Sequence, residues 1–180
     1  MHLLTVGHSN RALQELLSLL AAHGVAAVAD VRRHPASRRH PHFASAALER
    51  SLRDMGIAYL HVPELGGMRE PAAESPHTAL REGWFRAYAD HMGSSEFARG
   101  VTRLLELAAA RTTAAMCAEA EPSHCHRSLL ADALVARGHE VGHIVDAGPA
   151  RAHELHRGAR IERGTLVYDG AQRRMVVSER

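Results

Sequence analysis

The chain has 180 residues, of which 46% are hydrophobic, and its formal net charge at pH 7 is +2. This length suits one domain, and no apolar run reaches the roughly 18 residues of a transmembrane helix. The first residues lack the basic segment and long apolar core of a secretory signal, so we expect a cytoplasmic protein with no membrane partner. The sequence contains arginine but no lysine, which excludes Schiff-base chemistry by a lysine side chain.

Apolar periodicity predicts strands that alternate with helices along most of the chain. The predicted strands are residues 3–7, 25–31, 57–62, 113–118 and 141–145, and the predicted helices are residues 10–24, 44–55, 84–91, 95–110 and 123–138. This alternation predicts an α/β fold: a mostly parallel open sheet with helices on both faces.

Several side chains define the expected ends and faces of these elements. Asn10 is expected to cap the first helix, and Ser123 or His124 to open the last one. Phe43 is expected to make a core contact at the start of a helix. The helical spacing of Trp84, Tyr88 and His91 favours core positions over ligand contacts. Residues 63–83 form the longest stretch without periodicity, which is typical of a functional loop.

The C-terminal residues show a different pattern. We expect a single domain over residues 1–180, with a core of residues 1–146 and a short appendage of residues 147–180. Two apolar segments, residues 166–168 and 175–177, are predicted to form a β-hairpin around Asp169 and Gly170.

Polar residues follow four of the predicted strands, at the edge where parallel sheets bind ligands. After the first strand come Gly7, His8, Ser9, Asn10 and Arg11. Backbone N–H groups at a helix start attract anions, so these residues are candidates for substrate binding. The alternative is an ordinary helix cap followed by a solvated arginine.

The second and third clusters follow the next two strands. The second contains the binding candidates Arg32, Arg33, Ser37, Arg38 and Arg39, in a loop whose arginines suit phosphate or carboxylate recognition. A solubilising loop is the alternative. The third contains the further candidates Glu64, Gly66 and Gly67. Paired glycines allow a ligand to approach the backbone closely, although a surface turn would carry the same residues.

The fourth cluster, residues 116–128, allows three chemistries. Cys117 or Cys125 could be a thiolate nucleophile, activated by Arg127 and the start of a helix. Cys117, Cys125 and His126 could bind a metal, although their spacing is not that of a common zinc motif. Glu119 could carry acid–base work, with Asp30 as its partner and the cysteines packed in the core. We expect no metal and no cofactor, and we take Glu119, Asp30 and Cys117 as catalytic candidates and Cys125, His126 and Arg127 as binding candidates.

The four clusters together resemble a bacterial family catalogued as domain of unknown function 488. The matching features, which span about residues 3 to 145, are residues 5–11, Asp30-Val31-Arg32 with residues 37–39, residues 63–67, and Cys117-Ala118-Glu119 with Cys125-His126-Arg127. This resemblance implies a fold and a site but no settled reaction.

A weaker resemblance is to rhodaneses and related cysteine phosphatases, through Asp30-Val31-Arg32 and the segment between Cys117 and Arg127. This segment is longer than the cysteine loop of those enzymes. It also contains Glu119 and Glu121, which would repel an anionic substrate and raise the pKa of a neighbouring thiol.

The pattern favours an enzyme that acts on nucleic acid and hydrolyses an N-glycosidic bond to release a modified or damaged base from DNA. The arginine loop would hold phosphates, and Glu119 or Asp30 would stabilise an oxocarbenium-like sugar. A rhodanese-like or phosphatase-like cysteine enzyme is one alternative, and a non-catalytic module that binds nucleotide or nucleic acid is another. The expected partner is therefore DNA or a nucleotide, while the oligomeric state stays open.

Overall fold

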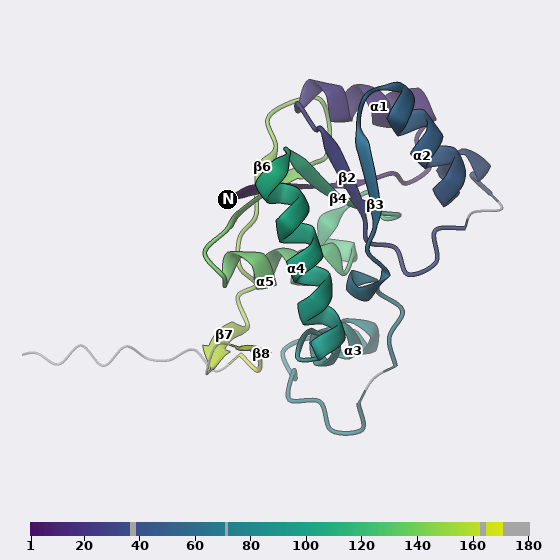
Figure 1. The fold of residues 1–180 in the computed structure, drawn as a ribbon. Coiled ribbons are helices and arrows are strands. Elements are labelled where there is room, and N and C mark those ends of the chain that lie inside the picture. The colour runs from purple at the N-terminus through teal and green to yellow at the C-terminus, as the bar shows by residue number, and fades with distance from the viewer. Residues whose placement is uncertain (37–38, 71, 163–164, 171–180) are drawn as a thin grey trace, which may run out of the picture.

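The computed structural model describes residues 1–36, 39–70, 72–162 and 165–170, and its centre is a six-stranded sheet (Figure 1). Five strands run parallel: β1 (His2–Gly7), β2 (Ala27–Asp30), β3 (Ala58–His61), β4 (Thr113–Cys117) and β5 (Glu140–Ile144). The short β6 (Arg151–Ala152) is antiparallel to β5 at one edge, and the strand order is β3-β2-β4-β1-β5-β6. The predicted α/β class is confirmed.

Helices cover both faces of this sheet, as predicted. The described residues form five α-helices. They are α1 (Leu13–Ala22), α2 (Ser45–Asp54), α3 (Gly83–Met92), α4 (Ser95–Ala110) and α5 (Arg127–Val135). Figure 1 shows α1 and α2 together on one side of the sheet and α4 and α5 on the other, and α3 packs against α4 and α5. Three single turns of 3₁₀ helix lie between them: η1 (Pro41–Phe43), η2 (Pro63–Leu65) and η3 (Pro122–His124).

Alternation along the strands produces two separate hydrophobic cores. In β4, Ala114 and Met116 pack with α1 and α2, whereas Ala115 and Cys117 pack with α4 and α5. This period of two is expected of a strand whose side chains point alternately to opposite faces. The sheet is therefore buried on both sides, as parallel sheets usually are, and only the ends of its strands are free to build a site.

The starts of two helices differ from the prediction. The N-cap of α1 is Ala12, and Asn10 is exposed. The reason is a turn in which the Arg11 N–H donates to the His8 carbonyl, 3.2 Å away, so the helix starts two residues later than a cap at Asn10 would require. Helix α5 begins at Arg127 because the extended backbone of Cys125 (φ −135°) separates it from η3.

Two predictions about aromatic residues have different outcomes. Phe43 is fully buried, which confirms its core contact. Trp84 is 43% exposed and stacks on Phe85 with ring centroids 3.7 Å apart, so its predicted core position is wrong. Trp84 lies in the first turn of α3, where the helix faces solvent, while Tyr88, one turn further, is buried.

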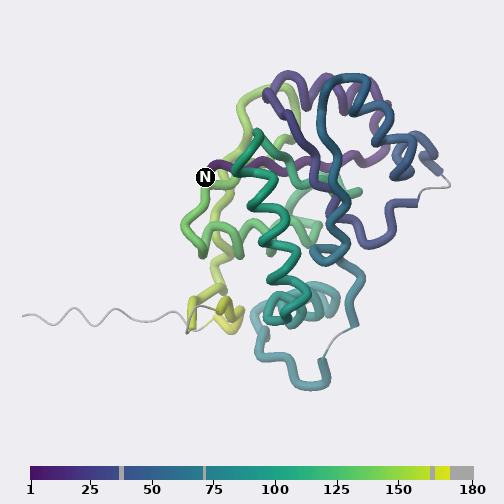
Figure 2. Tube along the Cα trace, in the orientation of Figure 1, coloured from purple at the N-terminus to yellow at the C-terminus, as the bar shows by residue number. Residues whose placement is uncertain are grey.

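The C-terminal hairpin exists, but it uses a different pair of strands from the predicted one. Strand β8 (Thr165–Tyr168) pairs with β7 (Ala159–Glu162), which precedes it. Residues 175–177, the predicted partner, lie outside the described residues. The hairpin lies beyond α5, away from α1 and α2 (Figure 2), and Leu166 and Tyr168 join the core beneath α4 and α5. None of the helices described has both the length and the apolarity needed to cross a membrane.

Candidate functional site

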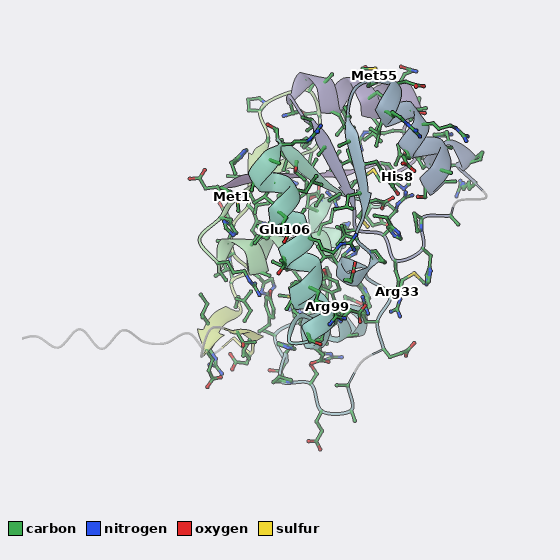
Figure 3. The ribbon with its side chains drawn as sticks, in the orientation of Figure 1. Met1, His8, Arg33, Met55, Arg99 and Glu106 are labelled. Carbon is green, nitrogen blue, oxygen red and sulfur yellow. The ribbon has the colours of Figure 1, made fainter. Side chains whose placement is uncertain are left out.

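The four polar clusters meet at the carboxyl ends of the parallel strands, which we call the carboxyl edge. The N–H groups of His8 and Ser9 donate to the carbonyls of Cys117 and Ala118, at 3.0 and 2.7 Å, and so join the first cluster to the fourth. Gly7 is required here because a Cβ at this position would lie 1.7 Å from the Glu119 carbonyl oxygen. Figure 3 shows His8 and Met1 at opposite ends of β1, with Arg33 on the same side of the molecule as His8.

The paired glycines bring the third cluster against the second and the fourth. A Cβ at Gly66 would lie 2.7 Å from Cβ of Arg33, and a Cβ at Gly67 would lie 2.9 Å from Nδ1 of His126. Two non-glycine residues at this edge, Ser9 (φ 48°) and Met68 (φ 58°), adopt the left-handed backbone conformation. Such conformations cluster at functional sites.

Asp30 is fully buried and all its hydrogen-bonding capacity toward this edge is used. Its Oδ1 accepts from the backbone N–H and Nε of Arg32, at 3.1 and 2.8 Å, and its Oδ2 accepts from Nη2 of Arg32 and the hydroxyl of Tyr59. This carboxylate holds Arg32 in place. Neither of its oxygens is free for the expected role of acid–base partner to Glu119.

His8 is a neutral, immobilised imidazole. Burial lowers its pKa to about 4, so the ring carries no charge at pH 7. Nδ1 lies 2.9 Å from the Ser9 carbonyl and therefore donates to it, which leaves Nε2 to accept from Arg32, 3.2 Å away. The ring also packs against Phe43 with centroids 4.2 Å apart. His8 is 5% exposed and holds no free proton to transfer.

Three of the predicted binding arginines donate their hydrogen bonds to oxygen atoms of the protein itself. Arg11 donates to the carbonyls of Gly7 and Val145, both at 2.7 Å, and Arg32 donates to Asp30. The fully buried Arg127 donates to the Thr5 hydroxyl at 3.1 Å and to the Glu119 carbonyl, and so fixes the turn after β4.

The exposed candidates lie on the loop after β2. Arg33 and Arg39 are exposed there, and Arg33 reaches the Met68 carbonyl at 3.1 Å. Ser37 and Arg38 lie outside the described residues. Across the edge, Ser9 is half-buried, and its hydroxyl lies 3.4 Å from Oδ1 of the exposed Asn10.

Cys117, Cys125 and His126 form a buried group that we call the thiol cluster. Nδ1 of His126 lies 3.8 Å from Sγ of Cys117 and 3.7 Å from Sγ of Cys125. A hydrogen bond between the two cysteines lowers the pKa of Cys125, aided by His126 and Arg127, and the same bond together with burial raises the pKa of Cys117.

The carboxylates of Glu64 and Glu119 differ in whether another side chain binds them. Glu64 is held by Arg103, whose Nη1 lies 2.8 Å from both carboxylate oxygens. The Glu119 side chain is exposed and makes no hydrogen bond or ion pair within the described part of the chain. Of the acidic candidates Asp30, Glu64 and Glu119, the last is thus the one whose carboxylate is available to a ligand.

One residue of the edge, Tyr59, was missed by the sequence analysis. It donates to Asp30 at 2.8 Å, whereas in the sequence it looks like an ordinary apolar position of a strand. Tyr88 was expected in the core and is buried there, with its ring 5.0 Å from that of His126. The contacts of both tyrosines with the edge come from the packing of β3 and α3, which no local pattern records.

A second polar assembly lies outside the predicted clusters. His143 bonds Thr5 through Nδ1 at 2.7 Å and His153 through Nε2 at 2.9 Å, and His153 bonds Asp132 at 2.8 Å. His143, His153 and Asp132 line a groove of about 860 Å³ that also includes Phe85. No spacing rule connects these residues, because they come from β5, the C-terminal segment and α5.

Comparisons with known proteins identify the family and nothing more specific. No curated protein and no solved structure matches the chain. No comparison supports the weaker resemblance to rhodaneses. A model of the family described as "Domain of unknown function DUF488" matches residues 12–134, which is more than half of the chain and includes three of the four polar clusters. The chain therefore belongs to the DUF488 family.

Proposed function

We propose that the protein is an enzyme that hydrolyses an N-glycosidic bond in DNA and releases a modified or damaged base. The observation that carries this proposal is the free carboxylate of Glu119. It lies at the carboxyl edge, where open α/β sheets bind ligands, and it is exposed, whereas Asp30 and Glu64 are each bound by an arginine.

A free carboxylate suits this reaction because cleavage of a glycosidic bond passes through an oxocarbenium-like sugar. Glu119 would stabilise the positive charge on the sugar and position the attacking water. The target nucleotide would leave the base stack to reach the edge. The buried ring of His8, which is neutral because burial lowers its pKa to about 4, would accept a hydrogen bond from Arg32 and so help to hold the edge rigid beside the bound nucleotide.

The arginines left for DNA binding are those that are not used inside the protein. Arg33 and Arg39 are exposed on the loop after β2, together with His34. We assign phosphate contacts to these residues, of which Arg33 also donates to the exposed Met68 carbonyl, and not to Arg11, Arg32 or Arg127, whose side chains are mostly buried and bind protein oxygens. Binding through a few exposed arginines would weaken with rising salt concentration.

A cysteine enzyme is the second candidate, because the pKa of Cys125 is lowered and a thiolate is the nucleophilic form. The cysteines are buried and Glu119 is exposed, so Glu119 is the better candidate for direct contact with a substrate. Cys117 is 6% exposed and Cys125 is 2% exposed, whereas the Glu119 side chain faces solvent.

The test compares wild type, Glu119→Gln and Glu106→Gln on single-stranded and duplex DNA that carries normal, modified and damaged bases. Glu106 is a matched control because it is also an exposed glutamate, placed on α4 (Figure 3). Mass spectrometry would detect free base and abasic sites. We expect wild type and Glu106→Gln to release base, and Glu119→Gln to lose about 10²–10⁴-fold in rate, the usual contribution of a positioned acid–base group.

The state of the DNA strand adds a second readout. Because the sequence has no lysine, no lysine Schiff base can cleave the abasic strand, and we expect the strand to stay intact. Base release that is equally fast in Glu119→Gln would contradict the proposal. Salt-dependent binding without release from any of the substrates would instead support a binding module, and loss of activity in Cys125→Ser alone would support the cysteine enzyme.

A further inference from the structure

We propose that the thiol cluster, Cys117, Cys125 and His126, binds a zinc ion. This inference replaces the expectation of a metal-free protein, and it does not depend on the reaction assigned to Glu119. It rests on the positions of three donor atoms, on the close approach of Gly67 to His126 and on the hydrogen bonding of His126.

The donor atoms are spaced as the corners of a zinc coordination tetrahedron would be. Zinc binds cysteine sulfur at about 2.3 Å and histidine nitrogen at about 2.0–2.1 Å, so tetrahedral angles place sulfur and nitrogen about 3.6 Å apart. The two observed separations between sulfur and Nδ1 are 3.8 and 3.7 Å, and all three donor atoms lie within 4.8 Å of one another.

The close approach of Gly67 fixes the position of the His126 ring. A Cβ at position 67 would lie 2.9 Å from Nδ1, so a side chain there would displace the imidazole from the two sulfurs. Gly67 lies in the loop after β3, Cys117 is the last residue of β4 and Cys125 lies just before α5, so three chain segments converge on one small volume.

The hydrogen bonding of His126 leaves its Nδ1 open to a metal bond. His126 is 7% exposed, and within the described residues its Nδ1 makes only the two long contacts with sulfur that are given above. A zinc ion bound to Nδ1 and both sulfurs would replace these two weak contacts with metal bonds.

The donor set selects the metal. Two thiolates and one imidazole suit zinc, whereas magnesium and calcium prefer oxygen ligands. Two thiolates also balance the double positive charge of the ion within a buried site. Three protein ligands leave one tetrahedral position for water, which is the arrangement of catalytic zinc sites.

The test measures metal binding directly. The purified protein would be assayed for zinc by plasma mass spectrometry, then stripped with a chelator and titrated with cobalt(II). We expect one equivalent of metal per chain and, with cobalt, a thiolate-to-metal charge-transfer band with the intense visible bands of tetrahedral coordination. Both signals should be lost in Cys117→Ser and Cys125→Ser and retained in His124→Ala, which removes an exposed histidine next to the cluster.

The His124→Ala control matters because the sequence has 15 histidines, which could hold zinc adventitiously. Metal that stays bound in both serine variants would overturn the proposal, as would stripped wild type that shows no charge-transfer band with cobalt. Since wild type alone can give this second result, the test does not depend on the folding of the variants. Base release by the stripped protein would show that the proposed function does not need the metal. Metal binding without base release would support the zinc site and not the proposed function.

Discussion

Burial determines which side chains at the carboxyl edge can exchange protons. His8 and His143 are both almost inaccessible, and burial lowers the pKa of each from 6.5 to about 4. In the unfolded chain, each histidine binds a proton near pH 6.5, whereas the folded protein does not bind it until about pH 4. Unfolding therefore takes up protons throughout this range, and acidification favours the unfolded state.

We expect the free energy of unfolding to fall as the pH is lowered from 6.5 to 5, by at most about 1.4 kcal/mol per pH unit for each histidine. Urea denaturation at a series of pH values would measure this slope. The variant His8→Asn, which cannot titrate, should show a smaller slope than wild type. Stability that is independent of pH in this window would contradict the burial of both imidazoles as neutral groups.

The sequence indicated which residues lie at the edge, but not which of them are buried and hydrogen-bonded within the protein. Asp30 and Glu119 both follow apolar strands, and nothing local distinguishes a sequestered carboxylate from a free one. Asp30 is sequestered because Arg32 folds back on it and Tyr59 arrives from β3, 29 residues away. Glu119 is free because Arg127 binds its carbonyl and not its carboxylate.

Among the elements, the close contact of β1 with the turn after β4 holds the edge together. Gly7 lies where the two segments touch, and a Cβ there would lie 1.7 Å from the Glu119 carbonyl oxygen and 2.9 Å from Nη2 of Arg127. The carbonyl belongs to a backbone that Arg127 already holds, so it cannot move away easily.

We expect Gly7→Ala to lower the free energy of unfolding by about 1–3 kcal/mol, the usual cost of overpacking. Chemical denaturation would measure this change. The control is Gly83→Ala in the first turn of α3, where a Cβ meets nothing within 4 Å. That variant should be neutral or up to about 1 kcal/mol more stable. Equal stability of the two variants would show that β1 and the turn after β4 are not in close contact.

Element types were predictable because apolar periodicity is a local property of the chain. The starts of α1 and α5 were not, since the turn at Arg11 and the extended backbone at Cys125 depend on contacts with other segments. The pairing of β8 with β7 was not predicted either, because residues 159–162 are all exposed or half-buried and lack the apolar pattern of a buried strand.

At the scale of the whole molecule, a line of buried polar groups attaches the C-terminal segment to the sheet. It runs from Thr5 on β1 through His143 and His153 to Asp132 on α5, which accepts a hydrogen bond from the Tyr168 hydroxyl at 2.9 Å. Asp132 and Tyr168 are essentially inaccessible, so the loss of either partner leaves a buried polar group unsatisfied.

We expect Tyr168→Phe to lower stability by about 1–3 kcal/mol, because one oxygen of the Asp132 carboxylate loses its donor. Hydrogen exchange would locate the effect. Amides of β7 and β8 should lose more protection than those of α4, because a peripheral hairpin can open before the core. A uniform loss of protection across both regions would show that the hairpin unfolds only with the rest of the protein.

The strand order β3-β2-β4-β1-β5 has a consequence for the synthesis of the protein. β1 leaves the ribosome before the other strands of this sheet, yet its two neighbours in the sheet, β4 and β5, begin at Thr113 and Glu140. Five of its six residues are buried in the folded protein, and they must wait as an unpaired apolar segment while most of the chain is translated. Such a segment is prone to aggregate, so newly made chains should depend on chaperones until β4 has emerged.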